Sequence, residues 1–184
     1  MSEPGIPRIV LGHGASGTAA SMAPYVGGLR ARGLVADAID LRRGKAEEAV
    51  GGFWLSTEQL VQGGPGPATA ILGGQSFGGR VASLVAAERP AAVRALVCFS
   101  YPLHRPGAPE TWDARTAHWP RIGCPVLLLS GESDPFARID LLRAAIARLG
   151  DVELVTYPRL GHGLKPVLDD VLDRVAAFVR STAA

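Results

Sequence analysis

The stretch AILGGQSFGG, residues 70–79, decides how this sequence folds. Its first residues are apolar and strand-like, and a helical pattern continues from it as far as Arg89. Ser76 therefore stands at a turn between a strand and a helix, in the centre of a Gly-x-Ser-x-Gly motif. A serine on such a sharp turn needs an unusual backbone angle, and Gly74 and Gly78 leave room for the crossing strand and helix. The motif predicts an exposed nucleophilic serine.

Short apolar runs alternate along the chain with longer stretches of helical period, which predicts βα units and a parallel sheet buried on both faces. The expected strands cover residues 6–11, 34–41, 68–72, 93–100, 125–130 and 152–157. The expected helices cover residues 18–32, 46–62, 77–89, 137–149 and 165–180. With 184 residues, of which 47% are hydrophobic, we expect a single α/β domain over residues 1–184, built as a three-layer α/β/α sandwich.

Two segments rich in glycine and proline interrupt this pattern. The sequence GGPGP at residues 63–67 predicts a surface turn. The segment 101–123 contains several prolines and two tryptophans, and it is long enough to shape a pocket.

Two later loops carry residues that could activate Ser76. Asp134 follows an apolar strand and precedes a helix, and His162 lies between two glycines after the last strand. Imidazoles titrate near neutral pH, so a histidine can take the proton of a serine hydroxyl while an acid orients its ring. Glu132 is a rival for the role of the acid, and an aspartate beside a proline is also a common helix N-cap.

The loop GHGASG at residues 12–17 has two interpretations. It matches the Gly-x-Gly-x-x-Gly pattern of dinucleotide sites, with Asp37 and Asp40 at the distance expected for a ribose-binding acid. It also fits an oxyanion loop, in which the Ala15 amide would join the Phe77 amide at the start of the following helix. We favour the oxyanion loop, because nucleotide binding leaves the serine turn and both later loops without a purpose.

The glycine loops allow one further prediction and one further interpretation. If residues 12–17 form an oxyanion loop, His13 is a buried, hydrogen-bonded structural residue. The glycine spacing of residues 74–79 also resembles a phosphate-binding loop. That interpretation fails because Arg80 and Val81 replace the required lysine and hydroxyl residue.

Composition narrows the class of protein. The 19 basic and 17 acidic residues are scattered without a Lys/Arg block, so nucleic-acid binding is not favoured. No leader peptide and no membrane-spanning run is expected, which predicts a cytoplasmic protein without membrane contact. Cys98 and Cys124 lack metal or redox spacing and are expected to be buried free thiols.

Five motifs, in this order, resemble the α/β-hydrolase superfamily, in particular its small dienelactone-hydrolase-like members. They are HGA at 13–15, GGQSFGGR at 73–80, SYPLH at 100–104, GESDPF at 131–136 and GHGL at 161–164. Within that group, the motifs resemble a bacterial branch that is related to a scaffold subunit of the vertebrate non-specific-lethal chromatin complex. The resemblance spans nearly the whole chain and implies a Ser76–Asp134–His162 triad, with no metal or organic cofactor.

The sequence also departs from that family. It begins at the position of the family's third strand, so we expect no antiparallel hairpin before it, and no large cap domain separates the fourth and fifth strands. A shallow, open cleft is the expected consequence. Dienelactone hydrolases use a cysteine nucleophile, so Ser76 argues against that particular substrate.

We therefore expect hydrolysis of a small carboxylic ester or thioester through an acyl-Ser76 intermediate. The alternative is a non-catalytic binding or scaffold protein that keeps the same fold. Candidate pocket-lining residues are Tyr101, Leu103, Trp112, Trp119 and Phe136. His104 and His118 are expected at the surface or lining the pocket. Four arginines either bias the cleft toward anionic substrates or are solvated surface charges. They are Arg42, Arg43, Arg105 and Arg138.

Overall fold

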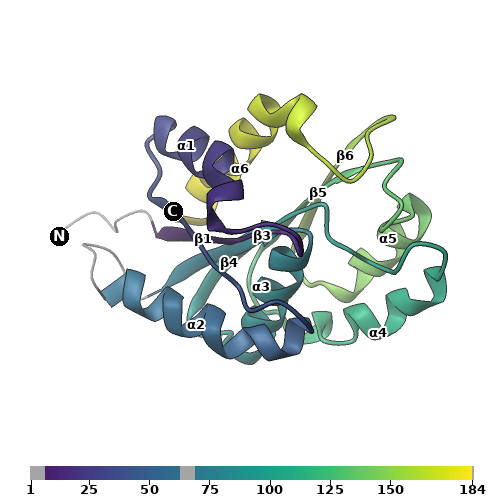
Figure 1. Ribbon diagram of the computed structural model, residues 1–184, viewed down its shortest axis with the longest axis horizontal. Helices are drawn as coiled ribbons and strands as arrows, with labels where there is room; N and C mark the ends of the chain where they lie inside the picture. Colours follow the sequence, from purple (N-terminus) through teal and green to yellow (C-terminus); the bar gives the residue numbers. More distant parts are fainter. Residues whose placement is uncertain (1–6, 63–68, 184) are drawn as a thin grey trace.

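The computed structural model describes residues 7–62 and 69–183, which form a six-stranded sheet with helices on both faces (Figure 1). All strand pairs are parallel, in the order β2-β1-β3-β4-β5-β6. The strands are β1 (Arg8–Gly12), β2 (Ala36–Ile39), β3 (Ala70–Gln75), β4 (Val93–Phe99), β5 (Val126–Gly131) and β6 (Val152–Tyr157). The predicted fold class, a three-layer sandwich of about six mostly parallel strands, is confirmed.

The helices form the two outer layers. The α-helices are α1 (Ala23–Ala31), α2 (Ala46–Gln62), α3 (Phe77–Glu88), α4 (Trp112–Thr116), α5 (Ile139–Ala145) and α6 (Leu168–Ala183). Short 3₁₀ turns are η1 (Ala19–Met22), η2 (Pro109–Thr111), η3 (Trp119–Arg121), η4 (Ile146–Arg148) and η5 (Lys165–Val167). Helices α1 and α6 cover one face of the sheet, and α2, α3 and α5 cover the other (Figure 1).

The strands are buried on both faces, as their continuous apolar sequences predict. In β3, Ile71 packs in the layer of α1 and α6, whereas Leu72 packs in the layer of α2 and α3. Both side chains have no exposed surface. Since successive residues of a strand point to opposite faces, a strand with two covered faces needs apolar residues at every position.

The strand order creates a place for a site. The chain passes from β2 on one side of β1 to β3 on the other, so the connections diverge at the carboxyl ends of β1 and β3. Those ends meet where Gly12 pairs with Gly74. In open parallel sheets, ligands bind outside the carboxyl ends of the strands at such a switch point.

Several element boundaries differ from the sequence-based expectation. The third strand continues through Gly73 and Gly74 to Gln75, so the turn follows the strand directly. The helix expected at 137–149 begins at Ile139, because the backbone at Arg138 is still extended. The helix expected at 18–32 is the 3₁₀ turn η1 followed by α1. The GGPGP segment at 63–67, and the first residues of the strands expected at 6–11 and 68–72, lie outside the described residues.

The segment between β4 and β5 contains only η2, α4 and η3, and it lies beside the sheet without forming a separate cap (Figure 1). Cys98 and Cys124 are free and buried, as predicted. Burial raises the pKa of both thiols, that of Cys124 to about 11. Within residues 7–62 and 69–183, no helix has the length and apolar character required to cross a bilayer.

Candidate active site

Ser76 lies on a strained turn between β3 and α3. Its φ angle is 49°, a value that residues other than glycine rarely adopt. A Cβ atom on Gly74 would lie 2.3 Å from the Gly12 carbonyl oxygen, and one on Gly78 would lie 2.2 Å from the same oxygen. The steric requirement predicted for both glycines is therefore real, and the obstacle is the end of β1. Close backbone packing of this kind can hold a residue in an unfavourable conformation.

The side chains of Ser76, His162 and Asp134 form a continuous hydrogen-bonded chain. The distance from Ser76 Oγ to His162 Nε2 is 2.8 Å, and that from His162 Nδ1 to Asp134 Oδ2 is 2.7 Å. A carboxylate can only accept, so Nδ1 carries the imidazole proton and Nε2 faces Ser76 as an acceptor. The Asp134 side chain has no exposed surface, whereas that of His162 is 25% exposed. The imidazole can therefore exchange a proton with a bound molecule.

Asp134 and its rival Glu132 point in different directions. Asp134 Oδ1 accepts the Phe136 amide at 2.8 Å, so the carboxylate organises its own turn with one oxygen and holds His162 with the other. Glu132 Oε1 instead accepts the Thr156 hydroxyl at 2.8 Å and pairs with Arg143. The structure brings Asp134, and not Glu132, to the histidine.

The loops that carry the acid and the histidine are packed directly against each other. The Ser133 amide donates to the Leu160 carbonyl at 2.9 Å. A Cβ atom on Gly131 would lie 2.1 Å from the same oxygen, so glycine permits this approach. The Phe136 ring lies against the imidazole of His162, with 4.4 Å between ring centroids. The packing of the two loops and the contact of the Phe136 ring thus hold His162 beside Asp134.

The loop after β1 lies beside Ser76, and Ala15 and Phe77 line the same cleft. Phe77 is the first residue of α3, so its amide has no acceptor within the helix. His13 is 2% exposed. Its Nδ1 donates to the Gly14 carbonyl at 2.7 Å and its Nε2 accepts the Leu41 amide at 3.0 Å. The predicted buried, hydrogen-bonded role of His13 is confirmed.

The two acids that a dinucleotide site would need already have partners. Asp37 pairs with Arg8 and Arg30, and Asp40 accepts the Ala19 amide at 2.7 Å. Their carboxylates hold the loop and helix that follow β1. This arrangement favours the oxyanion interpretation of residues 12–17.

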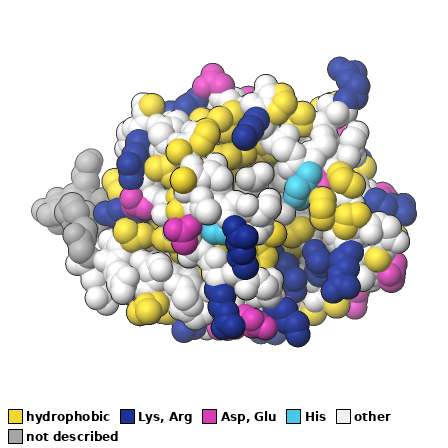
Figure 2. Space-filling view, in the orientation of Figure 1, with side chains coloured by type: hydrophobic (Ala, Val, Ile, Leu, Met, Phe, Trp, Pro, Cys, Tyr) yellow, Lys and Arg dark blue, Asp and Glu magenta, His cyan; other side chains and the backbone are white. Residues whose placement is uncertain are grey.

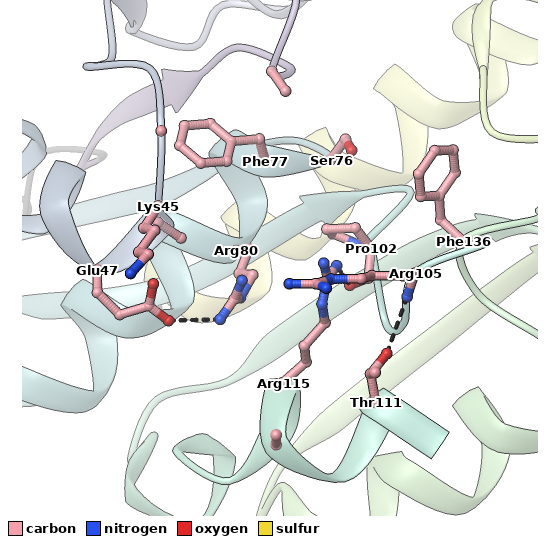
Figure 3. Close-up of a pocket in the computed structure, with 14 residues that line it drawn as sticks. Lys45, Glu47, Ser76, Phe77, Arg80, Pro102, Arg105, Thr111, Arg115 and Phe136 are labelled. Carbon is pink, nitrogen blue, oxygen red and sulfur yellow. Dashed lines mark hydrogen bonds and ion pairs between the residues drawn. The ribbon is translucent and has the colours of Figure 1, made fainter. Parts of the chain in front are cut away.

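An open cleft of about 650 Å³ adjoins Ser76 (Figure 3). Residues from the loop after β1, the start of α2, the start of α3 and the segment 101–123 line it. The lining residues include Ala15, Lys45, Glu47, Ser76, Phe77, Arg80, Pro102, Arg105, Thr111, Arg115 and Phe136. The segment 101–123 therefore shapes a pocket, as its length predicts.

Most of the aromatic and apolar pocket assignments were wrong. Of the five candidates, Phe136 lines this cleft. Tyr101, Leu103 and Trp119 are at most 2% exposed and belong to the core beneath the cleft. Trp112 packs against that core and stacks under the Arg148 guanidinium, 4.4 Å from the ring centroid. These side chains support the wall from behind and do not reach its surface.

The expectation for the other two histidines was also wrong. His104 is 2% exposed, and its Nε2 accepts the Arg138 amide at 2.9 Å, so it ties the segment 101–123 to the acid loop. His118 is 5% exposed and its Nε2 lies 2.8 Å from Ser83 Oγ. Both rings are internal structural groups.

The structure distinguishes between the two roles that the sequence leaves open for four arginines. Arg105 lines it, whereas Arg42 pairs with Glu48 and Arg138 with Asp140. Arg43 is exposed and is not among the lining residues. Figure 2 shows basic side chains gathered over the half of this face that α2 and α4 form.

Sequence reasoning missed Lys45, Arg80 and Arg115 as cleft residues. Arg80 could have been found, because it follows Ser76 by four residues in the helical pattern, and residues four apart lie on the same face of a helix. Within the described residues, no cluster of three or more His, Cys, Asp or Glu side chains could hold a metal ion.

Comparisons with known proteins agree with this fold. Residues 54–180 match a family described as "Alpha/beta hydrolase domain". The match covers more than half of the chain, so the chain belongs to the α/β-hydrolase family. It is thus an enzyme of the hydrolase type. No curated protein sequence matches the chain.

Solved structures with the same fold include enzymes that act on esters. A monoacylglycerol lipase from Paleococcus ferrophilus shares 18% sequence identity, with a TM-score of 0.80 over 97% of each chain. The Pyrococcus furiosus esterase Pf2001 shares 18% identity and has a TM-score of 0.82, covering 97% of this chain and 84% of the other. Est1E from Butyrivibrio proteoclasticus, solved with ferulic acid, shares 17% identity and has a TM-score of 0.79 over 98% and 90% of the two chains.

Proposed function

We propose that this chain is a serine hydrolase that cleaves a carboxylic ester or thioester through an acyl-Ser76 intermediate. The observation that carries the proposal is the hydrogen-bonded chain from Asp134 through His162 to Ser76. The strained turn that presents Ser76 at the edge of an open cleft supports it. Nucleophile, base and orienting acid are the three groups that acyl transfer through serine needs.

The proposed reaction begins when Ser76 Oγ attacks the carbonyl carbon of the ester. The bond from oxygen to carbon forms as the hydroxyl proton passes to His162 Nε2, and the carbonyl electron pair moves onto oxygen. The backbone amides of Ala15 and Phe77 donate to that oxyanion. Asp134 stabilises the imidazolium through its hydrogen bond to Nδ1.

Collapse of the tetrahedral species breaks the ester bond, and the imidazolium gives its proton to the leaving alcohol or thiol. Water then repeats the sequence on the acyl-enzyme: His162 takes a proton from water, and hydroxide attacks the acyl carbon. The bond between the acyl carbon and the Ser76 oxygen then breaks and releases the carboxylic acid, and the Ser76 oxygen recovers a proton from the imidazolium, which regenerates the free enzyme.

Within the α/β-hydrolase family, we also propose that the chain lies among the dienelactone-hydrolase-like members. The five ordered motifs and the absence of a cap in the described segment between β4 and β5 support this placement. The open cleft fits a small or freely accessible ester.

Covalent labelling with a fluorophosphonate tests the proposal, because this reagent modifies an activated serine and leaves an inactive one untouched. We expect Ser76 to carry the label in tryptic peptides and the wild-type protein to hydrolyse 4-nitrophenyl butyrate. Both signals should disappear in Ser76→Ala.

A folded wild-type protein that neither reacts with the fluorophosphonate nor turns over the ester would overturn the proposal. That result would favour the non-catalytic binding or scaffold role. Turnover that persists in Ser76→Ala would remove Ser76 from the mechanism.

A further inference from the structure

The wall of the cleft below Ser76 carries an excess of positive charge. Four cationic side chains line it, against a single carboxylate, that of Glu47. The cations are Lys45, Arg80, Arg105 and Arg115. Figure 3 shows the side chains of Arg80, Arg105 and Arg115 converging beneath Ser76 and Phe136. They come from α3 and from the segment 101–123, so the fold gathers them at this place from distant parts of the sequence.

These cationic side chains use only part of their hydrogen-bonding capacity within the protein. Arg80 Nη2 pairs with Glu47 at 2.6 Å, while its buried Nε has no acceptor among the described residues. Arg115 Nη1 donates to the Pro102 carbonyl at 2.8 Å, a neutral acceptor. Within residues 7–62 and 69–183, no carboxylate forms an ion pair with Arg105 or Arg115. Most of the positive charge of the wall therefore lacks a protein counter-charge.

The charges are close enough to oppose one another. Burial lowers the pKa of Arg115, and the positive charges of Arg80 and Arg105 lower it further. Holding like charges together costs free energy unless an anion accompanies them. Lys45, Ala46 and Glu47 at the start of the 17-residue helix α2 also line the cleft, so the positive end of the helix dipole faces it. The field in this part of the cleft thus favours an anion.

We infer that Arg80, Arg105 and Arg115 form a subsite for an anionic group carried by the substrate itself. The preferred substrate is then an ester whose acyl or leaving portion ends in a carboxylate or a phosphate. Guanidinium groups present paired N–H donors that match both anions. This inference rests on the proposed serine hydrolase, because Arg80 and Arg115 line the same cleft as Ser76.

A matched set of methyl esters tests the inference. Dimethyl glutarate is neutral, monomethyl glutarate carries a carboxylate, and methyl 4-phosphonobutyrate carries a phosphate-like group. We expect kcat/KM at low ionic strength to be about tenfold or more higher for an anionic ester than for the neutral one. Added salt should shrink this preference, because screening weakens partly exposed charge interactions. Comparison of the two anionic esters distinguishes carboxylate from phosphate.

Substitutions test whether the arginines of the cleft wall cause the preference for anionic esters. Arg115→Gln should lower kcat/KM for the anionic ester about tenfold and leave the neutral ester within about twofold. Arg105→Gln, whose side chain is exposed and therefore dispensable for folding, should act in the same direction. Arg174→Gln is the matched control, because this exposed arginine lies on α6, on the opposite face of the sheet. This variant should leave kcat/KM unchanged for both the anionic and the neutral ester.

Isothermal titration of the wild-type protein with glutarate and with inorganic phosphate measures the subsite without turnover. Binding that weakens in Arg115→Gln and not in Arg174→Gln supports the subsite, even if Ser76 proves unreactive toward fluorophosphonates. An active enzyme that shows no preference for either anionic ester and binds neither anion overturns the subsite and leaves the proposed hydrolase standing.

Discussion

Two serine–histidine pairs lie next to helix α3, and they differ in what surrounds them. His162 Nε2 lies 2.8 Å from Ser76 Oγ, and His118 Nε2 lies 2.8 Å from Ser83 Oγ. In the second pair, Ser83 Oγ donates to the Arg80 carbonyl at 2.7 Å, so His118 must supply the proton of its bond to Ser83. Ser83 and His118 are also buried, whereas Ser76 and His162 are partly exposed.

The contrast shows that a short serine–histidine distance does not define a nucleophile. At Ser76 the carboxylate of Asp134 fixes the imidazole with its acceptor nitrogen toward the hydroxyl. At Ser83 the imidazole is a donor, and burial together with the charges of Arg80 and Arg121 lowers the pKa of His118 to about 4. The first pair can move a proton toward a substrate, and the second fills the core.

The largest expected effect comes from removing the two hydroxyls in turn. Ser76→Ala should lower kcat for 4-nitrophenyl butyrate by roughly 10⁶-fold, as loss of a nucleophilic serine does in other enzymes. Ser83→Ala should leave kcat within about twofold. Steady-state kinetics on both variants measures the difference, and comparable losses in the two would make the contrast invalid.

The next effect concerns the acid that distinguishes the pairs. Asp134→Asn should lower kcat about 10⁴-fold, because an amide holds the imidazole in the wrong tautomer. Glu132→Gln is the matched control, since Glu132 contacts Thr156 and Arg143 instead of the histidine. Its kcat should stay within a few fold of wild type. If Glu132→Gln showed the larger loss, the assignment of the acid would be reversed.

The buried pair of Ser83 and His118 should make the free energy of unfolding depend on pH in the acidic range. The pKa of His118 falls from its ordinary 6.5 to about 4 on folding, chiefly because burial disfavours the charged ring. Between these values the unfolded chain binds a proton that the folded chain does not, so stability falls as pH drops from 6.5 toward 4. One such proton gives a slope of about 1.4 kcal/mol per pH unit.

Urea unfolding of wild type and His118→Gln across this pH range measures the slope. We expect the variant to be less stable at pH 7 and to lose less stability on acidification, because it lacks this proton. Equal slopes in the two proteins would show that His118 titrates normally.

The smallest expected effect is the structural contribution of the second hydroxyl. Ser83→Ala removes the acceptor of His118 Nε2 and leaves a buried donor without a partner, at a cost of about 1–3 kcal/mol in the free energy of unfolding. Urea denaturation at pH 7 gives this value. Unchanged stability would mean that His118 finds another acceptor.

The sequence predicts the parallel sheet and the three loops that bear Ser76, Asp134 and His162, because strand ends and glycine spacings are local features. It does not distinguish cleft from core among apolar residues. Trp119 and Phe136 are equally hydrophobic, yet the first is buried and the second lies against His162 in the cleft. That distinction depends on how the segment 101–123 and the loop after β5 pack against the sheet, a tertiary property.

The positions of several charged residues and histidines could not be predicted from the sequence either. The helical spacing from Ser76 indicates the place of Arg80, but nothing in the local pattern around Arg115 shows that α4 directs it to the same cleft. His104 and His118 lie in a segment rich in proline that predicts exposure, whereas their hydrogen bonds draw both rings inside. In each case the decisive contact joins elements that the chain separates by many residues.

The contact among Gly12, Gly74 and Gly78 has a consequence for how such an enzyme can change over generations or in the laboratory. Backbone meets backbone there, so the turn that presents Ser76 owes its position to main-chain packing. The wall formed by Arg80, Arg105 and Arg115 consists of side chains alone. If the proposed roles hold, the catalytic turn and the residues that select the substrate can be changed separately, so a library of substitutions restricted to the wall can explore new substrates without altering the turn that carries Ser76.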